Sequence, residues 1–331
     1  MAPSLVTVAI PTYNRPALLR EALASVVAQD LGEFEVLIVD NASPYDVEGL
    51  VAAFRDPRLR LHRQPQNVGL AANWRAALSL PDTRYVAVLE DDNLWAPWHL
   101  RAAVEALERH PAATFYGCSA TFFGAREGRY HPEWATGPDL YVRDWRETGY
   151  GSWLAGTPVL ASAVVFRRDA LAGLFWGGRT WPWCRDWLWW GQLALKGPFL
   201  FNPAGGLRYR WHDHNDTYQF RNQRGRAHWH YTVRELARRA YAAGGLRDLA
   251  AEIRALPAAA VSTIVIALSS PDTPPALAHQ AQRVFATRPE LAALPGCARD
   301  YRIAARVGGW WLRWADVRMR LMGRWWPTGR W

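Results

Sequence analysis

Up to residue 118, short apolar segments alternate with segments that favour helix, and this alternation constrains the fold more than any other feature. The apolar segments have the length of buried strands, and we predict strands over 5–10, 34–39, 58–62, 85–89 and 113–118. Helices are predicted over 16–29, 47–55, 69–80 and 97–109, the first of them capped by Asn14. The alternation predicts an α/β, Rossmann-like fold with a mostly parallel sheet and flanking helices, in which ligands bind at the carboxyl ends of the strands.

The pattern changes after Phe122. Residues 123–157 are rich in Gly, Pro, Trp and Tyr, which predicts loops and short strands. We then expect a strand over 158–167, helices over 169–175 and 186–195, and an extended segment over 199–211 with a turn at Gly205-Gly206. From about residue 225 the chain is helical and alanine-rich, interrupted by prolines, and we place a boundary between two regions there.

Three consecutive acidic residues, Glu90, Asp91 and Asp92, follow the predicted strand over 85–89. Carboxylate oxygens suit a hard divalent ion such as Mg²⁺ or Mn²⁺, which bridges phosphate oxygens. Acidic runs in exposed loops are often simply solvated, but here an apolar strand precedes the acids and Trp95 follows them. The run therefore favours a metal site at the edge of the sheet.

Other polar motifs lie at the same predicted edge. Pro11-Thr12-Tyr13-Asn14 ends the first strand, and Asp40 ends the second, where a carboxylate can accept the N–H of a nucleobase. Asn67 comes just before a helix, whose first N–H groups and dipole attract phosphate. Each motif alone is equally typical of turns and helix caps, so its meaning depends on the others.

In their order along the chain, these motifs resemble those of the family 2 glycosyltransferases with the GT-A fold. The strand ending Pro-Thr-Tyr-Asn-Arg-Pro, the turn Val-Asp-Asn-Ala-Ser and Asn-x-Gly before a helix occur in family order. Leu-Glu-Asp-Asp-Asn-x-Trp-x-Pro resembles the family signature Leu-Asp-Asp-Asp-Asp-x-Trp-x-Pro. The resemblance covers roughly residues 4–220. It implies a GT-A catalytic domain over 1–224, with a nucleotide-sugar half over 1–122 and an acceptor half over 123–224, followed by a helical region over 225–331.

The resemblance also implies roles for individual residues. Thr12, Tyr13 and Asp40 would hold the nucleobase, and Asp92 would be the main ligand of Mn²⁺ or Mg²⁺. The other residues that the motifs assign to the donor site are Pro11, Asn14, Asn67, Glu90 and Asp91. Glu90 stands where the family usually has Asp, so the chain departs from the family pattern at this position.

Two later motifs complete the resemblance. In Trp183-Cys184-Arg185-Asp186-Trp187, Asp186 would be the base that deprotonates the acceptor hydroxyl, although Arg185 replaces the usual Glu and Asp186 is also placed to cap a helix. In Tyr209-Arg210-Trp211-His212-Asp213-His214-Asn215, His212 and Asn215 fit the family spacing Tyr-Arg-x-His-x-x-Asn. His212 would therefore reach the metal or the diphosphate, with His214 as the second candidate.

The implied reaction is metal-dependent, inverting transfer of a sugar from a nucleotide diphosphate sugar to a glycan or lipid-linked acceptor. The resemblance favours a UDP- or dTDP-sugar and leaves a guanine nucleotide open.

Three alternatives compete with this interpretation. A degenerate GT-A protein that binds carbohydrate or acts as a scaffold is supported by the departures at Glu90 and Arg185. A nucleotidyltransferase is disfavoured because no Gly-rich, lysine-bearing loop follows the first strand. A nucleic-acid binder is disfavoured by the clustered acids, so no nucleic-acid partner is expected.

Tryptophan is abundant, with 20 residues. Trp153 and Trp183, in predicted loops, are candidates to stack on an acceptor sugar, whereas Trp189 and Trp190 lie in a predicted helix and favour the core. Residues 306–331 combine tryptophan with arginine, a pattern typical either of an amphipathic helix at a membrane interface or of a helix docked on the protein. The first interpretation would give peripheral membrane contact and suit a lipid-linked acceptor.

The net charge of +9 says little about partners, because nearly all the positive charge is arginine. The three cysteines are far apart and suggest neither a disulfide framework nor a zinc site. No uninterrupted apolar stretch has the length of a membrane span. These features predict a cytoplasmic location, with the tail as the means of association with the inner face of the membrane.

Overall fold

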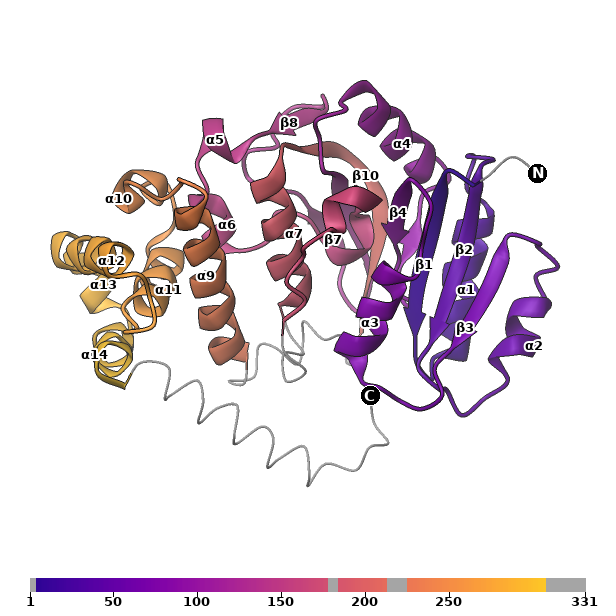
Figure 1. Ribbon diagram of the computed structural model, residues 1–331, viewed down its shortest axis with the longest axis horizontal. Coiled ribbons are helices and arrows are strands. Elements are labelled where there is room, and N and C mark those ends of the chain that lie inside the picture. Colours follow the sequence, from indigo (N-terminus) through magenta and orange to yellow (C-terminus); the bar gives the residue numbers. More distant parts are fainter. Residues whose placement is uncertain (1–3, 178–183, 213–224, 308–331) are drawn as a thin grey trace.

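The structure is a computed structural model and describes residues 4–177, 184–212 and 225–307 (Figure 1). A sheet with helices packed against it forms one end of the molecule, and a group of helices forms the other. The buried apolar side chains make one cluster that runs from the sheet into these helices, from Val6 to Cys297. The predicted α/β class is confirmed, as is the helical character of the C-terminal region.

Four parallel strands form the N-terminal part of the sheet, in the order β3-β2-β1-β4. They are β1 (Val6–Thr12), β2 (Phe34–Asp40), β3 (Leu59–Arg63) and β4 (Tyr85–Val88). The helices between them are α1 (Pro16–Val27), α2 (Val47–Ala52) and α3 (Leu70–Ser79). Because β1 pairs with a strand on each side and is buried along its whole length, its sequence is a continuous apolar run rather than an alternating one.

Beyond β4, the sheet continues in the order β9-β6-β10-β5 with mixed strand directions. These elements are β5 (Leu94–Trp95), α4 (His99–Arg109), β6 (Phe115–Gly124), β9 (Val165–Arg167) and β10 (Phe199–Trp211). Two short strands are added at the edges, β7 (Gly128–Tyr130) on β6 and β8 (Tyr141–Arg143) on β10. The longer ladders, including β6 with β10, are parallel, as predicted for most of the sheet.

The segment predicted as a strand over 158–167 is mostly not a strand. Only β9 pairs in the sheet, and Ala161–Ala163 forms a short 3-10 helix, η1. Ser162 in η1 is hydrogen-bonded to Glu90 and Asn93, contacts with a distant loop that no local pattern reveals. The helix predicted over 169–175 is likewise a short 3-10 helix, η2 (Arg168–Leu171).

Gly205-Gly206 does not form the predicted turn, because β10 continues through it. The pairing of β10 with β6 only shifts register between Asn202 and Leu207. Gly206 packs so closely against α4 that a Cβ atom would lie 2.6 Å from Nδ1 of His99. The glycine is therefore required by close packing rather than by a chain reversal.

The remaining helices extend the molecule away from β3 (Figure 1). They are α5 (Trp145–Thr148), α6 (Gly151–Ala155), α7 (Arg185–Lys196), α9 (Gly225–Ala242), α10 (Leu249–Glu252), α11 (Ala258–Leu268), α12 (Pro275–Thr287), α13 (Pro289–Ala293) and α14 (Cys297–Val307). α9 packs against α7 on one side and α11 on the other. Across the described parts of the chain, none of the helices has both the length and the apolar character needed to cross a bilayer.

Candidate active site

The chain leaves β1 through a tight turn. Asn14 has φ 53°, in the left-handed region that asparagine tolerates, and its backbone N–H donates to Oγ of Ser43 over 2.8 Å. The N-cap of α1 is Arg15, without a side-chain capping bond, so the predicted capping by Asn14 is wrong. Pro11 and Thr12 are buried before the turn and Tyr13 is half-buried within it. The hydrogen bond from Asn14 to Ser43 ties the turn after β1 to the loop after β2, and the turn positions Arg15.

Asp40 ends β2 and is fully buried. Its carboxylate accepts hydrogen bonds from the backbone N–H and the hydroxyl of Ser43, at 3.1 and 2.5 Å, and Nε of Arg63 lies 3.5 Å from it. A buried charge is tolerated only when it is hydrogen-bonded or paired, and these contacts meet that condition. Because Ser43 also accepts from Asn14, it links Asp40 to the turn after β1.

Asn67 lies in the loop before α3 and is tied to the end of β2. Its Oδ1 accepts from Nδ2 of Asn41 at 3.0 Å and from the backbone N–H of Gly69 at 2.9 Å. Asn41 in turn accepts from the backbone N–H of Val68 at 2.8 Å. These bonds fix the loop beside Asp40, on the side of the sheet edge where the sequence analysis placed the nucleotide.

The loop after β4 places two carboxylates against the end of β1. Asp91 and Asp92 are only 5% and 6% exposed. Oγ1 of Thr12 donates to Asp91 over 2.7 Å. Nη1 of Arg15 lies 3.2 Å from Oδ1 of Asp91 and 2.9 Å from Oδ2 of Asp92. One guanidinium therefore bridges both acids, a contact that the sequence analysis did not anticipate.

The electrostatics of this pair show why it needs positive charge. Burial raises the pKa of Asp91 to about 6, against the opposing effect of Arg15, and the neighbouring charge of Asp92 raises the pKa further. Adjacent carboxylates removed from water repel each other and are stable as anions only beside a cation. Arg15 supplies that charge. The negative field of the two carboxylates would also attract a divalent cation.

His212 follows β10 and lies beside the two aspartates. Its Nε2 lies 3.1 Å from Oδ2 of Asp92, the oxygen that also contacts Arg15. Arg210 donates from Nε to the backbone carbonyl of Asp92 at 3.0 Å and from its backbone N–H to Oδ1 of Asn93 at 2.9 Å. These bonds fasten the end of β10 to the acidic loop and position the imidazole.

Glu90 faces a different set of partners from Asp91 and Asp92. Its Oε2 accepts from the hydroxyl of Ser162 at 2.9 Å and from Nδ2 of Asn93 at 3.2 Å. The Ser162 hydroxyl also accepts from the backbone N–H of Glu90 at 3.0 Å. These contacts support the shape of the loop that presents the two aspartates.

Asp186 lies in the first turn of α7 and is half-buried. The N-cap of α7 is Cys184, with φ 58°, so Asp186 does not cap the helix. Burial raises the pKa of Tyr130 to about 12, and the charge of Asp186 adds to that rise, so the carboxylate and the phenol are neighbours. Tyr130 comes from β7 and donates to the carbonyl of Thr157 over 2.8 Å. The positive end of the helix dipole favours an anionic carboxylate at this position.

The tryptophans near Asp186 belong largely to the core. Trp153 lies in α6, is 2% exposed and accepts, through its carbonyl, a 2.6 Å hydrogen bond from Nε1 of Trp187. The expectation that Trp153 lies in a loop and stacks on a sugar is therefore wrong. Trp189 and Trp190 are buried, as expected.

A divalent ion fits this site only together with a substrate. In residues 4–177, 184–212 and 225–307, no three His, Cys, Asp or Glu side chains are grouped to hold a metal. Asp92 and His212 offer one carboxylate and one imidazole beside each other. Mg²⁺-type sites commonly use one or two carboxylates and complete their coordination with substrate phosphates and water. The donor set therefore fits a metal that binds along with a nucleoside diphosphate.

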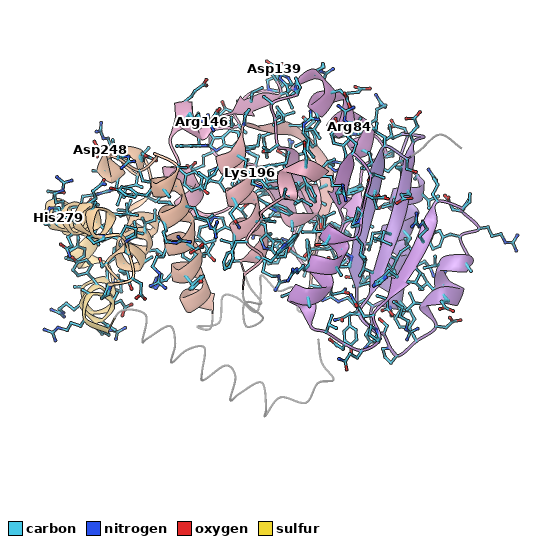
Figure 2. All side chains as sticks on the ribbon, viewed as in Figure 1. Arg84, Asp139, Arg146, Lys196, Asp248 and His279 are labelled. Atoms are coloured by element: carbon cyan, nitrogen blue, oxygen red, sulfur yellow. The ribbon has the colours of Figure 1, made fainter. Side chains whose placement is uncertain are left out.

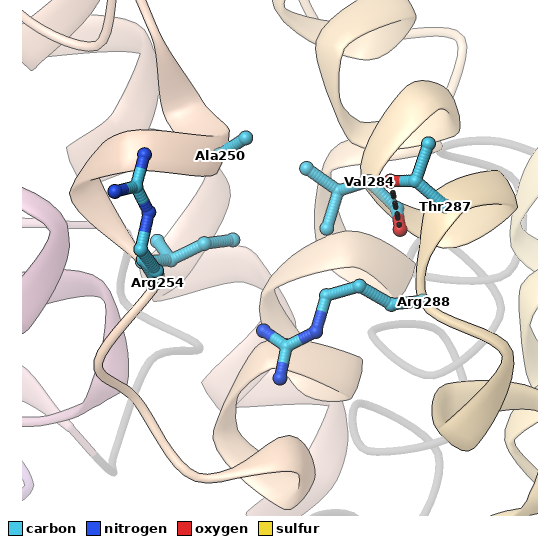
Figure 3. Close-up of a pocket in the computed structure, with 6 residues that line it drawn as sticks. Ala250, Arg254, Val284, Thr287 and Arg288 are labelled. Atoms are coloured by element: carbon cyan, nitrogen blue, oxygen red, sulfur yellow. Dashed lines mark hydrogen bonds between the residues drawn. The ribbon is translucent and has the colours of Figure 1, made fainter.

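A pocket of about 360 Å³ lies elsewhere, between α10 and α12 (Figure 3). It is lined by Ala250, Ile253, Arg254, Val284, Thr287 and Arg288. The pocket belongs to the helical end of the molecule, opposite β1–β3 (Figure 1), and no predicted site residue borders it. It is separate from the carboxylate edge of the sheet.

The sequence analysis assigned no role to several residues of the site, among them Arg15, Arg210 and Ser162. Arg15 and Arg210 stand inside motifs that pointed to the site, so their positions carried a signal. Ser162 lies in a segment predicted as plain strand and carried none. The expectations for His214, Asn215, Trp183 and most of the tail fall outside the described residues.

Comparison with known proteins identifies the family of the sequence. Residues 7–175, slightly more than half of the chain, match the profile of glycosyl transferase family 2. The succinoglycan biosynthesis protein ExoW of Rhizobium meliloti is 37% identical over 131 residues, which cover 38% of this chain and 40% of ExoW. The Escherichia coli glucosyltransferase WfgD is 26% identical over 113 residues, covering 34% of this chain and 45% of WfgD. The chain thus spans less than half the length of these relatives.

Solved structures support the fold over most of the chain. The Staphylococcus aureus protein TarS, residues 1–349 with UDP, has a TM-score of 0.58 at 16% identity, covering 91% of this chain and 90% of that one. The mannosyltransferase PcManGT of Pyrobaculum calidifontis, with GDP-mannose and Mn²⁺, has a TM-score of 0.52 at 20% identity, covering 98% and 90%. At these identities the likeness concerns the fold.

Proposed function

This chain belongs to glycosyl transferase family 2, and we propose that it is a metal-dependent, inverting enzyme that transfers a sugar from a UDP- or dTDP-sugar. The acceptor that we propose is a hydroxyl of a glycan or lipid-linked glycan. One observation carries the proposal: the ends of β1, β2, β4 and β10 bring Thr12, Asp40, Asp91, Asp92 and His212 to one edge of the sheet. This edge is where open α/β sheets bind their ligands.

The donor would lie across this edge. Asp40, held in a fixed orientation by Ser43, would accept the N–H of a uracil or thymine, with Thr12 and Tyr13 beside it. Asp92 and His212 would hold a divalent ion, which as a Lewis acid would stabilise charge on the leaving diphosphate. Arg15 adds positive charge at the same place.

Asp186 would be the general base. Its carboxylate would take the proton of the acceptor hydroxyl while the hydroxyl oxygen attacks the anomeric carbon, and the bond to the diphosphate oxygen would break. The sugar becomes oxocarbenium-like in the transition state, as in glycoside hydrolysis. Attack opposite the leaving nucleoside diphosphate inverts the anomeric centre.

The substrate classes are supported by the relatives' names alone. WfgD is named a UDP-glucose-dependent β-1,3-glucosyltransferase that acts on a GlcNAc-diphosphoundecaprenol, and ExoW is named for succinoglycan biosynthesis. TarS was solved with UDP, whereas PcManGT was solved with GDP-mannose and Mn²⁺. We therefore propose a role in glycan or glycolipid biosynthesis, with a uridine nucleotide as the first donor to test.

A donor-binding protein without transferase activity is the second candidate. Arg185, which replaces the family's usual Glu beside the base, is 8% exposed, and the Glu90 carboxylate is hydrogen-bonded to Ser162. These departures affect positions next to Asp186 and Asp92, so turnover as well as binding must be measured.

Thermal-shift binding of UDP, dTDP, GDP and ADP, each with and without Mn²⁺, tests the proposal. We expect stabilisation by UDP or dTDP that Mn²⁺ increases and that Asp92→Ala removes, together with release of nucleotide from the matching nucleotide sugar. Binding without any release would favour the second candidate. If no nucleotide stabilises the protein, the proposed function is wrong.

A further inference from the structure

Arg15 occupies the place beside Asp92 that a divalent ion would need. Its guanidinium lies 2.9 Å from Oδ2 of Asp92, and Nε2 of His212 lies 3.1 Å from the same oxygen. A metal held by Asp92 and His212 would have to approach this oxygen as well. Two cations cannot share it closely without strong repulsion, because the surrounding carboxylates are buried and poorly screened.

Exposure differs between the partners of this ion pair. The side chain of Arg15 is 34% exposed, whereas those of Asp91 and Asp92 are 6% and 8% exposed. Moving the guanidinium into solvent would restore its hydration, but the two acids would then be buried without a countercharge. As anions, the two acids therefore depend on a countercharge more than the partly exposed Arg15 depends on them.

The turn that carries Arg15 is also connected to the proposed nucleobase site. The backbone N–H of Asn14 donates to Ser43, and Ser43 donates to Asp40 over 2.5 Å. Asn14 is held in a left-handed conformation directly before Arg15. The proposed nucleobase contact at Asp40 and the ion pair at Asp92 are therefore connected through this one hydrogen-bonded turn.

We propose that Arg15 is the resident counter-ion of Asp91 and Asp92, and that a divalent ion replaces it on Asp92 when a nucleoside diphosphate offers the guanidinium another anionic partner. The inference rests on the proposed function and adds a positioning residue to it. Arginine pairs with phosphate through the same planar fork that it uses for carboxylates. Metal and nucleotide then bind with positive coupling, since each removes an obstacle to the other.

Manganese binding in the absence of turnover tests this inference. The probe is Mn²⁺ alone, titrated into the full chain and followed by the paramagnetic resonance signal of the free ion, and then repeated with UDP and with GDP. We expect wild type to bind Mn²⁺ weakly alone and more tightly with the nucleotide. Arg15→Gln should tighten Mn²⁺ binding to the nucleotide-free protein by about fivefold or more, and reduce the gain that the nucleotide provides.

Two further variants make the test specific. Arg15→Lys keeps the charge but lacks the guanidinium nitrogen, Nη1, that contacts both acids, so its Mn²⁺ affinity should fall between those of wild type and Arg15→Gln. It also serves if Arg15→Gln does not fold. Arg20→Gln removes an exposed arginine from α1, the helix that Arg15 precedes, and should leave Mn²⁺ affinity unchanged, which separates a local contact from a general effect of net charge.

The outcomes distinguish this inference from the proposed function. If Arg15→Gln binds Mn²⁺ no more tightly than wild type while both still bind UDP, the inference is wrong and donor binding stands. If nucleotides bind but Mn²⁺ binds to none of the variants, the inference also fails, together with the metal requirement. If neither Mn²⁺ nor any nucleotide binds, the proposed function itself is refuted.

Discussion

Nε2 of His212 lies 3.1 Å from Oδ2 of Asp92, although 120 residues separate the two in the sequence. The pairing of β10 with β5 brings them together, because Leu207 and Arg208 lie opposite Trp95 and Leu94. Arg210 then bonds to the acidic loop from its backbone and its side chain. The candidate metal site is thus formed where β10 pairs with β5, the last strand in the sheet order, and its two proposed ligands come from motifs far apart in the sequence.

Asp92 and Glu90 should differ in their importance for catalysis. Asp92→Asn should lower the rate of nucleotide release from the donor sugar about 100-fold or more, because charge stabilisation at the leaving diphosphate is lost. Glu90→Gln keeps an acceptor for Ser162 and Asn93 and should have a much smaller effect. Steady-state rates with saturating donor and Mn²⁺ measure both. Equal losses in the two variants would contradict the separate roles.

Asp186→Asn should abolish transfer to the acceptor while leaving UDP binding intact. The amide cannot accept the hydroxyl proton, and general bases of this kind contribute about 100-fold to 10,000-fold. Asp139→Asn, at an exposed loop position shown in Figure 2, is the matched control and should transfer at the wild-type rate. Transfer by Asp186→Asn at a rate near that of the control would remove Asp186 from the mechanism.

The tail beyond residue 307 should carry any membrane affinity of the chain. Its tryptophans and arginines suit an interface with anionic lipid, to which each basic residue near the surface contributes about 1 kcal/mol. A chain ending at Val307 retains the whole of α14 and should sediment less than the full chain with vesicles containing phosphatidylserine. Neutral vesicles should bind both chains weakly. Equal sedimentation of the two chains with anionic vesicles would refute membrane binding by the tail.

His99 should make the fold sensitive to acid. It begins α4, is fully buried beside Trp95 at a ring distance of 4.6 Å, and burial lowers its pKa to about 3. Unfolded histidine has a pKa of about 6.5, so the unfolded state takes up the proton first. The stabilising contribution of neutral His99 is complete above about pH 6.5 and is lost as the pH falls toward 3.

Between pH 7 and pH 5, this loss should lower the free energy of unfolding by about 2 kcal/mol. His99→Phe removes the titrating group, so its stability should depend less on pH over this interval, whatever its stability at pH 7. Urea unfolding at both pH values measures the difference. His279→Phe, at an exposed position on α12 (Figure 2), should show the wild-type pH dependence. The same pH dependence in His99→Phe would show that His99 does not cause it.

Local patterns predicted the N-terminal half of the sheet well. The four strands from β1 to β4 and their helices appear where the apolar runs and helical segments indicated, with ends shifted by a few residues. The reason is physical: β1 and β4 are buried along their whole length and β2 along most of it, so an apolar composition marks these strands, whereas β3 at the edge is only partly buried. The residues after each strand could be assigned to one edge because parallel strands end on the same side.

Predictions failed where a residue serves a partner far away in the sequence. Residues 158–164 have the composition of a strand, yet Ser162 turns the chain into η1 to bond with Glu90. Gly206 resembles a turn residue but makes room for His99, and Trp153 resembles a loop residue but packs in the core. Local propensity is weak compared with such packing and hydrogen bonding, so the tertiary contacts prevail.

The sequence by itself determined the fold class, the family resemblance and the edge of the sheet where the polar motifs meet. Those follow from apolar periodicity and from motif order, which are properties of neighbouring residues. Only the tertiary structure decided that Arg15 bridges Asp91 and Asp92, that Glu90 pairs with Ser162, and that His212 reaches Asp92. These contacts depend on strand order and register, which place side chains from distant segments a few ångströms apart, and that spacing determines the charge balance of the site.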